Sequence, residues 1–138
     1  MTDGYITDET LESKSSIAVT KEILIIDDDQ DILNLFDDFL SKEGYKVTPY
    51  LDPVKALKDI LASPQRYSLI VTDIRMPGMS GLELTKRVYE INQSIKIILM
   101  SAFEIDGDDL KELGYEKFIN KPVHMHAIAE TIDKILKG

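Results

Sequence analysis

The sequence predicts a single α/β domain built on a parallel β-sheet with helices on both faces. Five short strand-like segments alternate with helical patterns along 138 residues, and parallel strands need crossover connections of this kind. The runs Ile23–Ile26, Leu69–Thr72 and Ile95–Met100 are almost entirely apolar, as expected for strands that are buried on both faces. We therefore expect right-handed crossovers and a site at the carboxyl edge of the sheet.

Composition restricts the possible classes of function. The chain has a net charge of −9 and contains no cysteine. The negative charge argues against a nucleic-acid-binding surface, which needs clustered Lys and Arg, and favours partners that are basic or carry a cation. The lack of Cys excludes disulfides and Cys-based zinc sites. Because we find neither a secretory signal nor an apolar run of membrane-spanning length, we expect a cytoplasmic protein without membrane contacts.

Residues 1–20 are predicted to form a flexible acidic tail, since four acids accompany a single Lys and no periodicity is present. The first strand, Ile23–Ile26, ends at three consecutive aspartates. A helix should follow, because apolar residues recur at helical spacing until Gly44. We expect its inner face to contain Ile32, Leu35 or Phe36, Phe39 and Leu40.

The second strand, Lys46–Tyr50, is predicted at an edge of the sheet, because Pro49 has no backbone donor. Asp52–Pro53 is a strong helix start, with Asp as the N-cap and Pro at the first helical position. The inner face of this second helix should contain Val54, Leu57, Ile60 and Leu61.

The third strand, Leu69–Thr72, leads into a helix capped by Ser80, with Leu84, Val88 and Ile91 on one stripe. The fourth strand is Ile95–Met100.

The acidic segment 103–113 contains Gly107 and predicts a short or mobile fourth helix. Glu116–Ile119 is the fifth strand and Val123–Lys137 the last helix. Its inward residues are expected to be Met125, Ile128, Ile132, Ile135 and Leu136.

Polar residues stand at four of the five strand ends. They are Asp27 and Asp28, Asp73, Ser101, and Lys121. A parallel sheet brings these positions to one edge, where three carboxylates repel one another unless a cation is present. Oxygen ligands without Cys or His favour Mg²⁺. A carboxylate nucleophile beside Mg²⁺, Lys and a hydroxyl is suited to phosphoryl transfer.

Each of these residues also has an ordinary structural explanation. Asp27, Asp28 and Asp29 are good candidates for the cap and first turn of the helix that follows, and this is the role we expect for Asp29. Ser101 alone would be a turn hydroxyl, and Lys121 alone a solvated side chain. Their joint occurrence at successive strand ends favours a common site.

The chain resembles the receiver domains of two-component response regulators. The resemblance covers residues 21–137 and rests on ILIIDDD at 23–29, TDIRMPGMSG at 72–81, MSA at 100–102 and FINKP at 118–122. It implies a flavodoxin-like (βα)5 fold with strand order 2-1-3-4-5. It also implies that residues 21–138 form the receiver domain.

The resemblance implies a role for each acid of the site. Asp73 would accept the phosphoryl group. Asp28 would bind Mg²⁺ directly, Asp27 would hold a water of its shell, and the backbone carbonyl of Arg75 would be a further ligand. As the acceptor, Asp73 would also contact the metal.

The resemblance also implies how phosphorylation is sensed. Ser101 would bond the phosphoryl group, with Ala102 leaving room for it, and Lys121 would pair with a phosphoryl oxygen. The bond before Pro122 would be cis, and Phe118 would be the switch aromatic.

By the same resemblance the donor would be a histidine kinase, a phosphotransfer protein or a small acyl phosphate. The surface made by the fourth helix, fifth strand and fifth helix would change and bind a downstream protein. The domain would catalyse only its own phosphorylation and dephosphorylation and would not otherwise be an enzyme. Because the sequence stops just past the last helix, we expect no output domain, and the chain would be a stand-alone regulator, a phosphorelay intermediate or a fragment of a longer protein.

Two features depart from the family pattern. The segment from Ser101 to Lys121 is short and acidic, and it includes the expected output face. Arg75 and Phe103 occupy positions thought to tune dephosphorylation, and a bulky pair there should slow the attack of water.

Other functions fit the sequence less well. A haloacid-dehalogenase-type phosphatase also uses an aspartate, Mg²⁺ and a Lys, but Asp31 stands where that family has Thr or Val. A non-phosphorylated relic would usually lack one of the site residues. A flavin or dinucleotide module would need a glycine-rich turn after the first strand. His124 and His126 are expected at the surface or helix start, not in a metal site.

Overall fold

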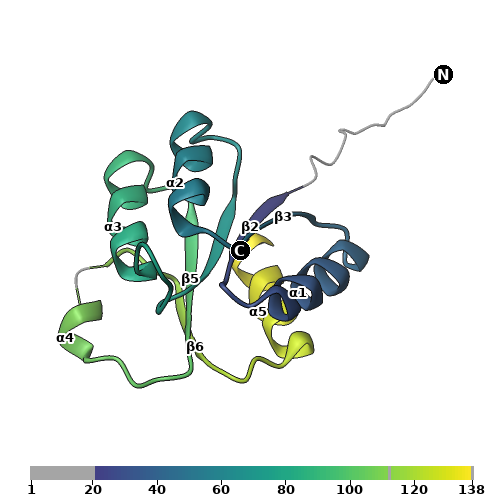
Figure 1. Ribbon diagram of the computed structural model, residues 1–138. Coiled ribbons are helices and arrows are strands. Elements are labelled where there is room, and N and C mark those ends of the chain that lie inside the picture. Colours follow the sequence, from purple (N-terminus) through teal and green to yellow (C-terminus); the bar gives the residue numbers. More distant parts are fainter. Residues whose placement is uncertain (1–20, 112, 138) are drawn as a thin grey trace.

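The computed structural model describes residues 21–111 and 113–137 and contains a five-stranded parallel sheet (Figure 1). The strand order is β3-β2-β4-β5-β6, which is the predicted order 2-1-3-4-5. The flavodoxin-like fold is therefore confirmed. The strands are β2 (Glu22–Ile26), β3 (Lys46–Tyr50), β4 (Leu69–Asp73), β5 (Lys96–Ser101) and β6 (Lys117–Asn120).

Helices cover both faces of the sheet, as predicted. Figure 1 shows α1 and α5 together on one face and α2, α3 and α4 on the other. Each face has its own apolar core, one joining α1 and α5 to the sheet and the other joining α2 and α3 to it. The helices are α1 (Gln30–Lys42), α2 (Pro53–Ala62), α3 (Gly81–Ile91), α4 (Gly107–Leu110) and α5 (Met125–Lys137).

Side-chain caps start the first three helices where the sequence predicts. Asp29 accepts from the Asp31 N–H, Asp52 from the Val54 N–H and Ser80 from the Glu83 N–H. Each cap satisfies one of the backbone donors that the first turn leaves unpaired. The caps therefore fix where the chain turns away from the carboxyl ends of β2, β3 and β4.

Some expected inner-face residues are exposed. On α1 the buried residue is Phe36, whereas Leu35 is 53% exposed. Our prediction was wrong for Val54, Leu61 and Ile91, which are 37%, 43% and 51% exposed. A helix lying on a sheet buries only one stripe, and on α2 this stripe includes the small residue Ala56 together with Leu57 and Ile60.

The fourth helix is a single turn, Gly107–Leu110, as the sequence predicted. The prediction for residues 1–20 lies outside the described residues. In the described part of the chain, no helix has the length and apolar character needed to cross a membrane.

Candidate functional site

The register of the sheet brings the polar strand ends to one edge. Ile26 pairs with Thr72, Asp73 with Met100, and Ser101 with Asn120. The residues that directly follow these pairs, including Asp27 and Lys121, must therefore lie at the same edge. The sequence correctly predicted that these strand ends lie at one edge of the sheet, and the structure shows which of their side chains contact one another.

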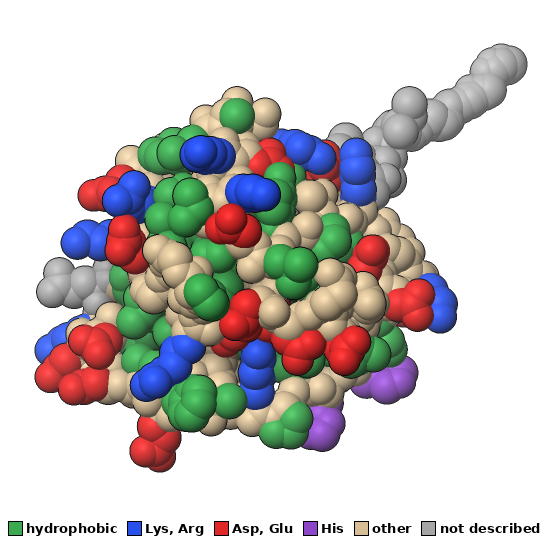
Figure 2. All heavy atoms as spheres, viewed as in Figure 1, with side chains coloured by type: hydrophobic (Ala, Val, Ile, Leu, Met, Phe, Trp, Pro, Cys, Tyr) green, Lys and Arg blue, Asp and Glu red, His purple; other side chains and the backbone are tan. Residues whose placement is uncertain are grey.

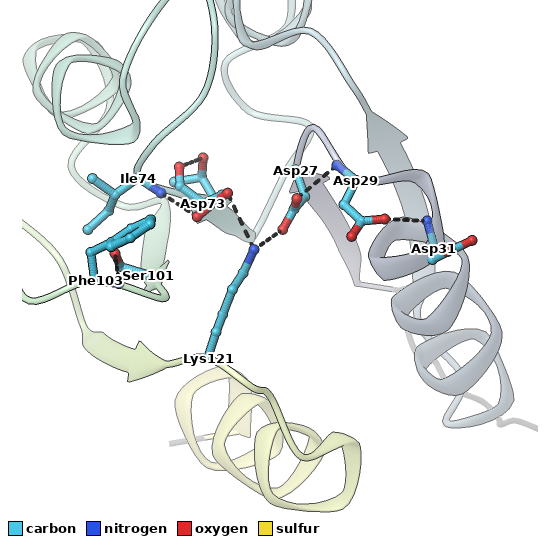
Figure 3. Close-up of polar contacts among 9 residues, drawn as sticks. Asp27, Asp29, Asp31, Asp73, Ile74, Ser101, Phe103 and Lys121 are labelled. Atoms are coloured by element: carbon cyan, nitrogen blue, oxygen red, sulfur yellow. Dashed lines mark hydrogen bonds and ion pairs between the residues drawn. The ribbon is translucent and has the colours of Figure 1, made fainter.

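Lys121 joins the two buried carboxylates of the site (Figure 3). Its Nζ lies 2.7 Å from Asp27 Oδ2 and 3.3 Å from Asp73 Oδ2. Asp27 is fully buried and Asp73 is 7% exposed, so neither charge is well solvated. A buried charge needs a partner of opposite sign, and the ammonium group supplies it to both.

Backbone donors hold the other oxygen of each carboxylate. The Asp29 N–H donates to Asp27 Oδ1 and the Ile74 N–H to Asp73 Oδ1, both at 3.0 Å. These bonds orient the two carboxylates toward Lys121, as Figure 3 shows. The acids and the lysine therefore form one preorganised polar group.

Burial and neighbouring charges shift the pKa values of Asp73 and Lys121. Burial, followed by the charge of Asp27, raises the pKa of Asp73 above its usual value, although Lys121 opposes this. Burial lowers the pKa of Lys121, but its hydrogen bond to Asp27 and both carboxylate charges outweigh burial, so the pKa lies above the usual value. Lys121 is therefore a permanent cation at neutral pH.

Asp28 completes a three-carboxylate cluster. It is exposed, and one oxygen from each of Asp27, Asp28 and Asp73 lies within 4.8 Å of the others. Hard oxygen ligands with one side open to solvent suit Mg²⁺, which retains several waters. The donor set therefore fits the metal that the strand ends predict.

Ser101 and Phe103 lie on the side of Asp73 away from Asp27 (Figure 3). Ser101 is buried, and its Oγ accepts a hydrogen bond from the Phe103 N–H at 3.0 Å. The Arg75 guanidinium stacks over the Phe103 ring at 4.6 Å from its centroid. This contact joins the loops that follow β4 and β5.

Sequence reasoning missed the part played by Gly81. A Cβ at this first residue of α3 would come within 2.3 Å of the Asp73 backbone oxygen, so only glycine fits without a shift. Its N–H also donates to Ile74 O at 2.8 Å. A glycine directly after the helix cap was the available sequence signal.

The remaining predicted residues lie near the site or at its margin. Phe118 is half-buried on β6 in register with Leu99, and the Lys121–Pro122 bond is cis. His124 and His126 are exposed. The His126 ring meets Phe39 edge-on at 5.0 Å, and neither histidine belongs to the carboxylate cluster.

Comparison with known proteins points to one family. The family model described as "Response regulator receiver domain" matches residues 23–133. The chain is 32% identical over 120 residues to sporulation initiation phosphotransferase F of Bacillus subtilis, covering 86% of this chain and 95% of that protein. It is 33% identical over 121 residues to the response regulator receiver protein CpdR of Brucella abortus, covering 84% and 97%.

Solved structures agree with this similarity. A CheY-like receiver domain protein from Methanospirillum hungatei superposes with a TM-score of 0.80 at 28% identity, covering 86% of this chain and 95% of the other. The response regulator TrrA of Thermotoga maritima, solved in complex with Mg²⁺-BeF, gives 0.75 at 30% identity, covering 84% and 99%.

Proposed function

Since the chain belongs to the response regulator receiver family, we propose that Asp73 is its phosphorylation site in a two-component phosphorelay. The observation that carries this proposal is the pair of contacts from Lys121 to Asp27 and Asp73. A carboxylate that is desolvated, oriented and held beside a permanent cation is prepared to receive an anionic group. We take residues 21–138 as the receiver unit.

The proposed reaction transfers a phosphoryl group to Asp73. An oxygen of the carboxylate forms a new bond to phosphorus as the bond from phosphorus to the donor breaks. The donor is a phosphohistidine of a kinase or phosphotransfer protein, or a small acyl phosphate. The bonding electrons leave with the imidazole or the acyl oxygen, and water later releases inorganic phosphate.

Asp27, Asp28, Asp73 and the backbone carbonyl of Arg75 are the proposed ligands of Mg²⁺, with Asp27 acting through a bound water. When bound, the ion would neutralise charge on the phosphoryl oxygens. The closeness of the three carboxylate oxygens supports this assignment. The relative TrrA, whose structure contains Mg²⁺ and BeF, adds support from within the family.

Lys121 and Ser101 are the proposed contacts of the phosphoryl group. Lys121 would exchange a carboxylate oxygen for a phosphoryl oxygen, and the buried Ser101 hydroxyl would donate to another. Movement of Ser101 would then let Phe118 pack inward from its half-buried position. This is a population shift between two packings of the surface formed by α4, β6 and α5, which would bind a downstream protein.

Intact mass tests the assignment. Incubation with a small acyl phosphate and Mg²⁺ should add one phosphoryl group, and Asp73→Asn or a metal chelator should abolish the addition. Asp38→Asn, which removes an exposed carboxylate of α1, is the matched control and should behave as the parent. Addition to Asp73→Asn at another residue would disprove the assignment.

The same preparation separates a receiver from a phosphatase. A receiver catalyses only its own phosphorylation and dephosphorylation, so a generic phosphomonoester should not be turned over. Sustained turnover that depends on Asp73 would favour the haloacid-dehalogenase type instead.

A further inference from the structure

The edge of the sheet opposite Asp73 carries a row of basic side chains. Lys21, Lys46 and Lys96 stand at the amino ends of three strands, β2, β3 and β5. Backbone hydrogen bonds fix their places, since the Lys46 N–H donates to Lys21 O at 3.0 Å and the Lys96 N–H to Ser68 O at 3.1 Å. Figure 2 shows basic side chains beside the first described residues. A basic edge stands out in a chain with a net charge of −9.

Among the described residues, few acids form ion pairs with the basic side chains of this edge. Glu22 Oε1 lies 3.0 Å from Arg66 Nε and 3.8 Å from Lys46 Nζ. Lys96 forms no ion pair with an acid of residues 21–111 or 113–137. The edge therefore has positive charge available for a further anionic group.

The surface between Lys21 and Lys96 is hollowed. These two lysines, the hydroxyls of Ser68 and Ser94, and the apolar side chains of Ile135 and Leu136 line a pocket of about 270 Å³. A lining that combines lysines, polar residues and apolar residues fits a segment in which acidic and apolar residues are neighbours.

We propose that the acidic segment 8–12 of this same chain binds the pocket. Asp8, Glu9 and Glu12 would face Lys21 and Lys96, and Leu11 would pack against Ile135 and Leu136. The composition of residues 1–20, with four acids and one Lys, complements the charge of the edge. The contact holds these acids at the end of the sheet that is remote from the Asp73 carboxylate.

Attachment at Lys21 favours this occupant over a separate acidic partner. Lys21 lines the pocket, and Glu12 is nine positions before it in the sequence. That length of chain spans up to about 30 Å, which is ample to reach Lys96. A tether of this length gives an effective concentration on the order of millimolar. Because the ion pairs are exposed, added salt weakens the contact.

A spin label tests the contact independently of any phosphorylation chemistry. The chain contains no Cys, so Thr7→Cys gives a single attachment point for a nitroxide in the full-length protein. We expect the label to broaden the amide signals of Ser68, Ser94 and Leu136. The broadening should fall severalfold at 1 M salt, where the screening length is about 3 Å.

Two sets of variants test whether the broadening depends on the opposite charges of segment and pocket, or only on the covalent attachment of the segment at Lys21. Replacing Asp8, Glu9 and Glu12 by Asn, Gln and Gln keeps the tether and should reduce the broadening severalfold. Lys21→Gln with Lys96→Gln should do the same. Lys58→Gln with Lys86→Gln, on exposed helix lysines, makes the same change in net charge and should have no effect.

Equal broadening with the neutral segment, or with both edge lysines replaced, overturns the proposal. A mixture of spin-labelled and isotope-labelled chains tests the other occupant. Broadening between chains would assign the pocket to a second copy and would also overturn it.

Discussion

The ammonium of Lys121 lies 2.7 Å from Asp27 Oδ2, although 94 positions separate the two residues in the chain. Asp27 is fully buried, so a carboxylate that follows the first strand depends on a cation that follows the last. The contact links the ends of the first and last strands of the chain, β2 and β6, and Asp73 lies beside the same cation.

Lys121→Met should destabilise the fold in the absence of Mg²⁺. The substitution leaves two buried carboxylates without their cation, and breaking such a buried pair costs about 3 kcal/mol. Denaturant unfolding measures the loss, and saturating Mg²⁺ should recover part of it. Lys117→Met, at an exposed lysine of β6, is the control. Equal free energies of unfolding for the two variants would contradict the pairing.

Asp73→Asn should stabilise the fold at neutral pH by about 1 kcal/mol, within the range that single stabilising substitutions commonly reach. The folded pKa of Asp73 is raised, so the folded state binds more protons and its stability falls as the pH rises above the ordinary carboxyl pKa of 3.8. The advantage of the Asn variant should therefore be small at pH 3.5 and grow toward pH 7. Thermal or denaturant unfolding across this range checks the sign, and a constant difference would contradict it.

Mg²⁺ should stabilise the folded protein. A ligand that binds only the folded state contributes about 1.4 kcal/mol at ten times its Kd. Asp28→Asn should abolish this gain with little effect on the metal-free protein, because Asp28 is exposed. Asp38→Asn should retain the full gain. Titration of the melting temperature with Mg²⁺ compares the three proteins, and a gain that survives in Asp28→Asn would exclude that residue as a ligand.

Gly81→Ala should impair both stability and phosphorylation of Asp73. Its Cβ would collide with the Asp73 backbone oxygen at 2.3 Å, so either α3 or the end of β4 must move, at a cost of about 1–3 kcal/mol. Gly107→Ala is the matched control, because a Cβ there meets no atom within 4 Å. Unfolding and acyl phosphate labelling should both separate the two variants. A parent-like Gly81→Ala would show that the close approach is unimportant.

Arg75 and Phe103 should slow the loss of the phosphoryl group. Figure 3 shows Phe103 near Asp73, and the Arg75 guanidinium lies over the Phe103 ring. If this pair hinders an attacking water, Arg75→Ala and Phe103→Ala should each speed autodephosphorylation severalfold. Because the two groups contact each other, the double variant should be less than additive. A time course by intact mass measures the rates, with Lys55→Ala as control. Unchanged rates in both single variants would reject this role.

Helical spacing did not always predict correctly which apolar residues of a helix are buried. Spacing alone could not choose between Leu35 and Phe36, and it wrongly placed Val54, Leu61 and Ile91 inside. Which apolar residue of a stripe is buried depends on the helix's rotation against the sheet and on its neighbours. Both are properties of tertiary packing.

The sequence by itself determined the alternation of elements, their caps, the edge position of β3 and the set of polar strand ends. These features follow from local physics, because apolar periodicity, proline and N-cap side chains act over a few residues. Tertiary structure alone decided that Lys121 pairs with Asp27 as well as Asp73, that Gly81 must have no side chain, and that Arg75 stacks on Phe103. Each depends on how close separate elements of the fold come to one another, which patterns acting over a few residues do not encode.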